Sequence, residues 1–157
     1  IFFAKCVILV EGPTDKAVIM ATAENLKGKT WLDDNDIVII DTSNKYYVMK
    51  YCKLCEAYGI PYVALIDKDN TSSHSEIQCN NKNVYYIDNN LEEELKKICG
   101  NVKLDSETVS VITHNSKDAD KYYDLINEIC KKNGNNVLKN SQFGKLLDRV
   151  EKLINNN

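Results

Sequence analysis

The sequence predicts an α/β protein whose core is a mainly parallel, four-stranded sheet flanked by helices. Four short apolar runs are the first observation, at residues 6–10, 37–40, 62–66 and 84–87. Each run is continuous rather than alternating, which is typical of strands that are buried on both faces of a sheet. Helix-like segments separate the first three runs, and this alternation favours parallel strands joined by right-handed crossovers.

Helices are expected between these strands. The first should begin at Pro13, because the first helical position tolerates a residue without an N–H, and should end near Lys27, just before Gly28. The second should cover residues 44–58 and end before Gly59. These two helices would carry the chain from one strand to the next, so that the first three strands run in the same direction.

The chain changes character after the third strand. Residues 68–83 are polar and predict a surface loop or a short helix. A helix is expected at 91–99 and a weak fifth strand at 108–112. Two amphipathic helices, at about 117–132 and 141–154, should follow as additional C-terminal helices.

Composition limits the classes of function. The chain of 157 residues has a net charge of −3, and Arg149 is its only arginine. A general nucleic-acid-binding surface is therefore not expected, and phosphate contacts would have to be local or bridged by metal ions. No apolar run approaches the roughly 20 residues of a membrane span, so no membrane association is expected.

The N-terminus and the cysteines indicate the compartment. The chain begins without Met, enters a strand almost at once and has no secretion signal, so we expect a piece of a longer cytoplasmic protein with free thiols. Cys52 and Cys55 form a C-x-x-C pair, but together with Val48 they follow the spacing of one helix face. We interpret them as buried packing residues rather than as a zinc or redox site.

Carboxylates follow each of the four predicted strands. Glu11, Asp41, Asp67 and Asp88 come directly after the apolar runs, and Asp69 lies two residues beyond Asp67. Any one of them could be an ordinary turn residue. Because the carboxyl ends of parallel strands meet at one edge, the acids should gather there, where their mutual repulsion would favour a bound cation. Carboxylate oxygens suit Mg²⁺ or Mn²⁺.

Two motifs resemble the Toprim domain, the topoisomerase–primase module. "VILVEGPTD" and the later "ALIDKD" match its glutamate at the end of the first strand and its D-x-D at the end of the third, with Glu11, Asp67 and Asp69 in those positions. The opening "FFAKCVILVEGPTDKAVI" is similar to the Toprim domain of the OLD (overcoming lysogenization defect) nucleases, which are ATPase–nuclease fusions associated with phage–host conflict. The resemblance covers the chain to about residue 99.

The resemblance assigns further residues. The family has a second acid four residues after the first, matched by Asp15, and a later acidic motif, matched by Glu92 in "NLEEEL". It also has a late lysine, matched by Lys145 in "FGKLL" or alternatively by Lys139. The implied metal ligands are Glu11, Asp15, Asp67, Asp69 and Glu92; the implied catalytic residues are Glu11, Asp67 and Lys145, and the implied nucleic-acid contacts are Lys139 and Lys145.

The resemblance also implies the activity and the fold. The fold would be a Toprim-type, Rossmann-like domain over residues 1–157, with a core at 1–99 and a helical extension at 100–157. The implied function is a metal-dependent DNA endonuclease that uses one or two Mg²⁺ or Mn²⁺ ions. No P-loop is present in this sequence. ATP would therefore act only through an upstream ATPase domain, and a homodimer could form through that missing part.

Two alternatives stay open. The chain could be a non-catalytic Toprim module that serves nucleic-acid binding and assembly, because a fold does not determine a function. The segment "ALIDKDNT" also matches the D-x-D-x-T motif of haloacid-dehalogenase-like phosphatases, with Asp67 as nucleophile and Asp69 as general acid. In that family the motif usually lies on the opening strand and is followed by a later G-D pair, and this sequence has neither feature.

Overall fold

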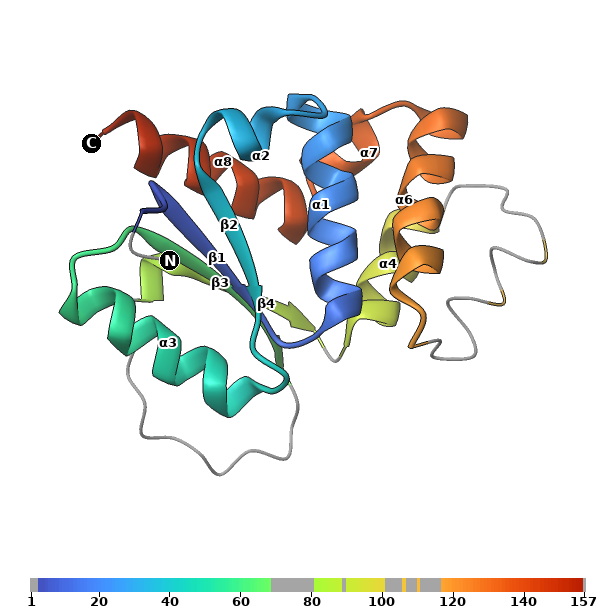
Figure 1. Ribbon diagram of the computed structural model, residues 1–157. Coiled ribbons are helices and arrows are strands. Elements are labelled where there is room, and N and C mark those ends of the chain that lie inside the picture. The colour runs from blue at the N-terminus through green and yellow to red at the C-terminus, as the bar shows by residue number, and fades with distance from the viewer. Residues whose placement is uncertain are drawn as a thin grey trace.

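A four-stranded parallel sheet forms the centre of the computed structural model, which describes residues 3–68, 81–88, 90–100, 106, 110 and 117–156. Its strands are β1 (Cys6–Val10), β2 (Ile37–Asp41), β3 (Tyr62–Lys68) and β4 (Val84–Asp88). Their order is β2-β1-β3-β4 and every pairing is parallel. The predicted α/β class and the four predicted strands are confirmed (Figure 1).

Helices cover both faces of this sheet (Figure 1). One face carries only α3 (Lys45–Ala57) among the described helices. The hydrophobic core on the opposite face includes residues from most of the remaining helices, which are α1 (Pro13–Lys27), α2 (Trp31–Asp34), α4 (Leu91–Cys99), α6 (Ala119–Asn133), α7 (Asn136–Lys139) and α8 (Gln142–Asn155). A short 3₁₀ turn, η1 (Asn81–Asn83), precedes β4.

Two hydrophobic cores lie on either side of β1, whose five residues are all fully buried. Ile8 and Val10 belong to the larger core, which the sheet shares with α1, α6 and α8. Val7 and Leu9 belong to the smaller core beneath α3. Alternate residues of one strand thus face opposite layers, as the pleat of a strand requires, and this explains the continuous apolar run. The buried face predicted for Val48, Cys52 and Cys55 is confirmed.

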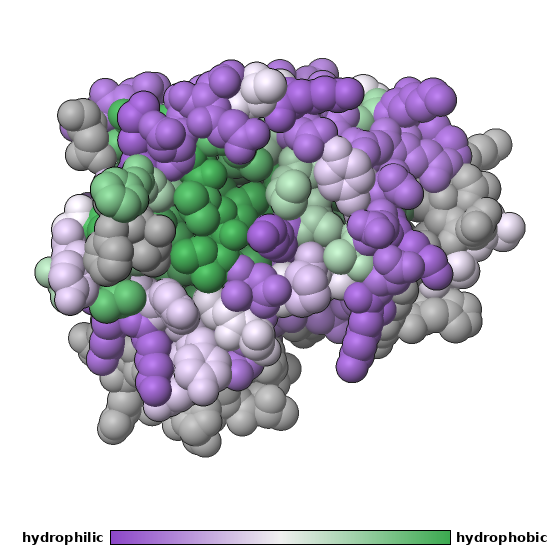
Figure 2. All heavy atoms as spheres, viewed as in Figure 1, coloured by the Kyte–Doolittle hydropathy of each residue, from purple (hydrophilic) through white to green (hydrophobic). Residues whose placement is uncertain are grey.

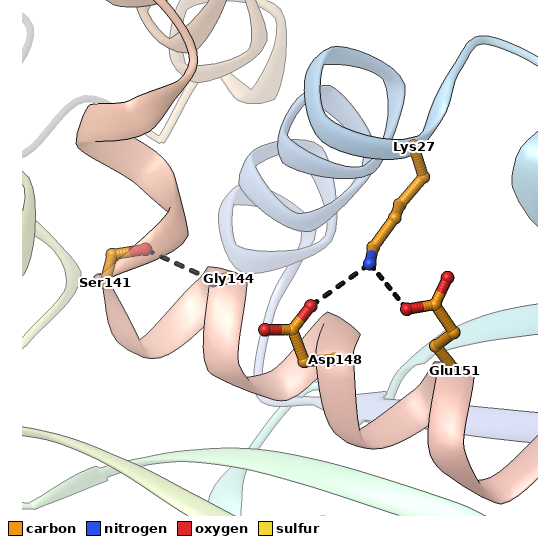
Figure 3. A network of polar contacts seen from close by, with 5 residues as sticks. All are labelled: Lys27, Ser141, Gly144, Asp148 and Glu151. Atoms are coloured by element: carbon orange, nitrogen blue, oxygen red, sulfur yellow. Dashed lines mark hydrogen bonds and ion pairs between the residues drawn. The ribbon is translucent and has the colours of Figure 1, made fainter.

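Polar contacts join α8 to the rest of the molecule (Figure 3). The Lys27 ammonium at the end of α1 contacts the carboxylates of Asp148 at 3.1 Å and Glu151 at 2.9 Å. At the start of α8, the Gly144 N–H donates to the Ser141 hydroxyl at 3.2 Å, which is an N-cap contact. The ion pairs join α8 to α1, and the apolar face of α8 packs against β1, β3 and β4.

The C-terminal half of the chain confirms the helices predicted from the sequence but not the predicted fifth strand. The two C-terminal helices are present within a residue or two of their predicted bounds. The weak strand at 108–112 falls almost wholly outside the described residues, and its one described residue, Ser110, is helical rather than extended. Most of the polar segment 68–83 also lies outside them. In the described part, no helix combines the length and apolar character needed to cross a membrane.

The edge strand β2 keeps apolar side chains at the surface. Hydrophobic atoms gather over this strand in the space-filling view, within a largely polar surface (Figure 2). Val38 is 40% exposed, whereas its neighbours Ile37 and Ile39 are buried in the larger core. The alternating exposure of β2 differs from the full burial of β1, because only the face of this edge strand that carries Ile37 and Ile39 is covered by the larger core.

Candidate metal centre

Glu11 and Asp67 meet at the carboxyl edge of the sheet. Glu11 follows β1, and Asp67 is the second-to-last residue of the adjacent strand β3. The backbone N–H of Asp67 donates a hydrogen bond of 2.9 Å to Oε1 of Glu11. Both side chains are only partly buried. The predicted placement of these two acids on adjacent strand ends is therefore confirmed.

Asp15 stands beside this pair in the first turn of α1. Its Oδ2 accepts a hydrogen bond of 2.9 Å from the N–H of Gly12, the residue that caps the helix. Asp15 is buried, with only 9% of the residue exposed. Burial, followed by repulsion from Glu11 and to a lesser extent from Glu92, raises the pKa of Asp15 to about 7. The site thus concentrates more negative charge than its protein surroundings neutralise.

Glu92 joins the site from the first turn of α4. The hydroxyl of Tyr122, a fully buried residue of α6, donates to Oε1 of Glu92 at 2.6 Å. Burial, and then the hydrogen bond to Glu92, raises the pKa of the Tyr122 phenol, so the hydroxyl remains a donor at neutral pH. The contact fixes Glu92 relative to a helix of the C-terminal part of the chain.

Lys45 brings a positive charge to the same edge. It is the first residue of α3, and its ammonium donates to the backbone carbonyl of Asp67 at 2.8 Å. Sequence reasoning found neither Lys45 nor Tyr122. The only signals for them were a lysine directly after the loop that follows β2 and a phenol within the apolar stripe of α6.

The other acids at strand ends and the two predicted lysines are exposed or lie outside the described residues. Asp41 is exposed, and its Oδ1 accepts from the N–H of Ser43 at 3.0 Å, so it stabilises a turn. Asp69 and the side chain of Asp88 lie outside the described residues. Lys145 and Lys139 are exposed, in the first turn of α8 and at the end of α7, and neither is hydrogen-bonded to an acid of the described site.

The donor set suits a hard divalent cation. Carboxylate oxygens are the preferred ligands of Mg²⁺ and Mn²⁺. The pKa of Asp15 is raised first by burial and then by repulsion from Glu11, and a bound cation would relieve that repulsion. Within the described ranges, however, no three acidic, histidine or cysteine side chains are already grouped as a set of metal ligands. Glu11 and Glu92 each engage one oxygen in a protein hydrogen bond. A bound ion would therefore use their second oxygens or replace those bonds.

Comparison with known proteins identifies the fold that carries this site. Residues 2–69 match the family model described as "Overcoming lysogenization defect protein-like, TOPRIM domain". This part of the chain is thus similar to an OLD-like TOPRIM domain. This match spans β1 to β3 and includes Glu11, Asp15, Asp67 and Asp69. No curated protein gives a significant match to the sequence.

Solved structures of OLD proteins share the fold over nearly the whole chain. The C-terminal region of the Xanthomonas campestris pv. campestris OLD protein, in the structure phased with iodine, superposes with a TM-score of 0.58 at 22% identity, covering 99% of this chain and 98% of that one. The structure of the same region phased with platinum gives a TM-score of 0.57 at 23% identity, covering 98% of this chain and 95% of that one. The C-terminal region of the Burkholderia pseudomallei OLD protein gives 0.51 at 17% identity, covering 96% and 99%. The C-terminal helices of this chain therefore lie within the region of structural likeness.

The ionisation of Asp15 should make stability depend on pH. Its folded-state pKa is about 7, against 3.8 for an unperturbed side chain, so the unfolded chain releases its proton first. The metal-free protein should therefore lose stability as pH rises from about 4 to about 7, by on the order of a few kcal/mol, and the loss should then level off. Asp15→Asn should remove most of this slope, as measured by urea unfolding in chelator at several pH values.

Addition of Mn²⁺ supplies the second arm of this test. The wild type should melt at a higher temperature with Mn²⁺ at neutral pH, because the ion binds the folded state and offsets the repulsion at Asp15. Mn²⁺ should raise the melting temperature of Asp15→Asn by less than that of the wild type. Asp41→Asn, at the exposed end of β2, should match the wild type both in its pH dependence of stability and in its response to Mn²⁺. If the free energy of unfolding depends on pH equally in Asp15→Asn and in the wild type, the ionisation assigned to Asp15 is wrong. If Mn²⁺ leaves the melting temperature of the wild type unchanged, the proposed metal site is wrong.

Proposed function

We propose that this chain is the metal-dependent DNA endonuclease domain of an OLD-like ATPase–nuclease and hydrolyses phosphodiester bonds. The observation that carries the proposal is the contact between Glu11 and Asp67 across adjacent strand ends, at 2.9 Å, with the buried Asp15 beside it. An acid cluster at the carboxyl edge of a parallel sheet lies where such folds bind their ligands. The OLD-like TOPRIM match of residues 2–69 supports a nuclease-type function.

The proposed chemistry divides the residues by role. When bound, one or two Mg²⁺ or Mn²⁺ ions would supply an activated water and would offset the charge of the phosphate. Lys45 would hold the end of β3 in place through the Asp67 carbonyl, and Tyr122 would orient Glu92. Lys145 would offset charge that develops on the phosphate, with Lys139 along the DNA path. The ions would be held by Glu11, Asp15, Asp67, Asp69 and Glu92.

The organisation of the whole protein is part of the same proposal. Residues 1–157 would act as one nuclease domain, with its core at 1–99 and a helical extension at 100–157. The extension shares the larger hydrophobic core with the sheet and supplies Tyr122 to the site. ATP would act through an upstream ATPase domain in a cytoplasmic protein that dimerises through that upstream part.

A non-catalytic binding and assembly module is the second candidate. The observation in its favour is that the described residues contain no preassembled group of three metal ligands. The phosphatase alternative has less support, because the D-x-D motif lies on the third strand and its first acid is linked through its N–H to Glu11 on the neighbouring strand. Metal-dependent cutting distinguishes these candidates.

The test uses supercoiled plasmid with Mn²⁺, Mg²⁺ or chelator, followed on a gel. The chain, alone or as part of the full natural gene product, should nick or linearise the plasmid with Mn²⁺ or Mg²⁺ and leave it intact with chelator. A gel-shift assay on the same samples measures binding separately. If the full gene product shifts DNA but cuts under none of these conditions, the binding-module candidate replaces the endonuclease.

A further inference from the structure

Two exposed tyrosines stand on the outer face of α3. Tyr46 is 50% exposed and Tyr47 is 45% exposed, although α3 already buries Val48, Cys52 and Cys55 against the sheet. Nothing in the smaller hydrophobic core therefore explains the two aromatic rings. Large aromatic side chains at the surface are a common feature of binding sites.

Lys50 orders these rings. One helical turn after Tyr46, its ammonium lies 4.4 Å from the centroid of the Tyr46 ring and 5.6 Å from that of Tyr47. The two rings meet edge to face with their centroids 5.6 Å apart. Cation–π and aromatic contacts of this kind restrict the rings before any ligand arrives, which lowers the entropic cost of binding.

The same helix is locally basic within an acidic protein. Residues 43–55 contain Lys45, Lys50 and Lys53 and no aspartate or glutamate, whereas the whole chain has a net charge of −3. The first turn of α4, in contrast, holds three glutamates. The outer part of α3 thus offers aromatic rings together with positive charge, the combination that binds single-stranded nucleic acid.

The helix that carries the tyrosines begins at the candidate metal centre. Lys45 precedes them in sequence and contacts the Asp67 carbonyl at 2.8 Å. The connection into α3 is also fixed to the end of β1, since the N–H of Thr42 donates to the Val10 carbonyl at 3.0 Å. A strand of DNA held on α3 would consequently begin within a short distance of the acids at the ends of β1 and β3.

From these observations we infer that Tyr46, Tyr47 and Lys50 form a stacking platform for unpaired bases of a single-stranded DNA segment. The inference rests on the proposed function in that it names the form of DNA that the endonuclease holds beside its metal centre. Bases in an intact duplex are stacked on one another and leave no face for the tyrosines. The platform therefore selects gapped, frayed or single-stranded DNA over a blunt duplex.

Fluorescence anisotropy in chelator tests the platform without cutting. The probes are a labelled thymidine-rich single strand and a blunt duplex of equal length. Tyr46→Ala/Tyr47→Ala should weaken single-strand binding by about tenfold or more, because each stacked base contributes a factor of about five or more. Tyr46→Phe/Tyr47→Phe should bind nearly as the wild type, since stacking needs the ring and not the hydroxyl. Tyr58→Ala, which alters a 63%-exposed tyrosine at the other end of α3, is the matched control.

Ultraviolet crosslinking to an iodouracil-substituted single strand gives an independent measurement. Peptide mapping should place the crosslink on Tyr46 or Tyr47 in the wild type, and the Phe variant should still bind. The inference is overturned if the wild type shows no single-strand binding, if the Ala variant binds as tightly as the wild type, or if the crosslink maps elsewhere. Normal binding without any metal-dependent cutting would overturn the endonuclease proposal and leave the platform intact.

Discussion

Asp67→Ala should reduce Mn²⁺-dependent plasmid cutting by about a thousandfold or more, to the limit of detection on a gel. A metal ligand contributes several kcal/mol to the stabilisation of charge at the reacting phosphate, and each 1.36 kcal/mol corresponds to about a factor of ten in rate. The substitution is well suited to the question because Glu11 accepts its hydrogen bond from the backbone N–H of Asp67, which alanine retains. The experiment therefore removes the carboxylate while it leaves the contact between β1 and β3 in place.

Three variants serve as controls for this result. Asp41→Ala removes an acid from the end of β2 that lies in an exposed turn, and it should cut normally. Cys52→Ala should also cut normally, because Cys52 lies on the buried face of α3 and packs in the smaller core. Lys145→Ala should cut more slowly while its Mn²⁺-induced thermal shift is retained, since its proposed role is confined to the transition state. Full activity of Asp67→Ala would refute the endonuclease proposal.

Among glycine-to-alanine substitutions in the described helices, Gly144→Ala should cause the largest loss of stability. A Cβ at this buried position would collide with the carbonyl oxygen of Leu138 and lie 2.6 Å from that of Lys139. Both obstacles are backbone atoms, so α7 or α8 would have to move. We expect a loss of about 3 kcal/mol or more in the free energy of unfolding, measured by urea denaturation.

Gly100→Ala is the matched control for this substitution. Gly100 ends α4 with a φ of −54°, which any residue can adopt, and its added Cβ would meet the Lys97 carbonyl oxygen at 3.4 Å, an ordinary contact. It should change stability by less than about 1 kcal/mol. If both glycine variants unfold at the same urea concentration, the close approach of α7 and α8 is not needed for the fold.

The strands were predictable because buried strands have apolar residues at consecutive positions of the sequence. β1 is buried on both faces and therefore reads as a continuous apolar run. The helix α1 was predictable at its start from Pro13, and the buried face of α3 from the spacing of Val48, Cys52 and Cys55. Local patterns of this kind need no knowledge of distant residues.

The site was predictable only in part. The meeting of Glu11 and Asp67 followed from their places at strand ends, because parallel strands end at the same edge. Two other contacts join residues that are far apart in the sequence: Tyr122 and Glu92 are separated by 30 positions, and Lys45 and Asp67 by 22. They depend on how α6 and α3 pack, which no local pattern specifies. Asp41 also lies at this edge of the sheet, as predicted, but its carboxylate accepts a hydrogen bond from the turn that follows β2.

The hydrogen bond between Asp67 and Glu11 also has a consequence for how the protein is made. The two residues are 56 positions apart, and β3 pairs with β1 rather than with β2, which precedes it in the chain. During synthesis, the unit of β1, α1 and β2 can emerge from the ribosome and begin to fold while the metal centre is still incomplete. A translation product that stops before β3 therefore lacks the paired acids, and under the proposed function it would have no nuclease activity.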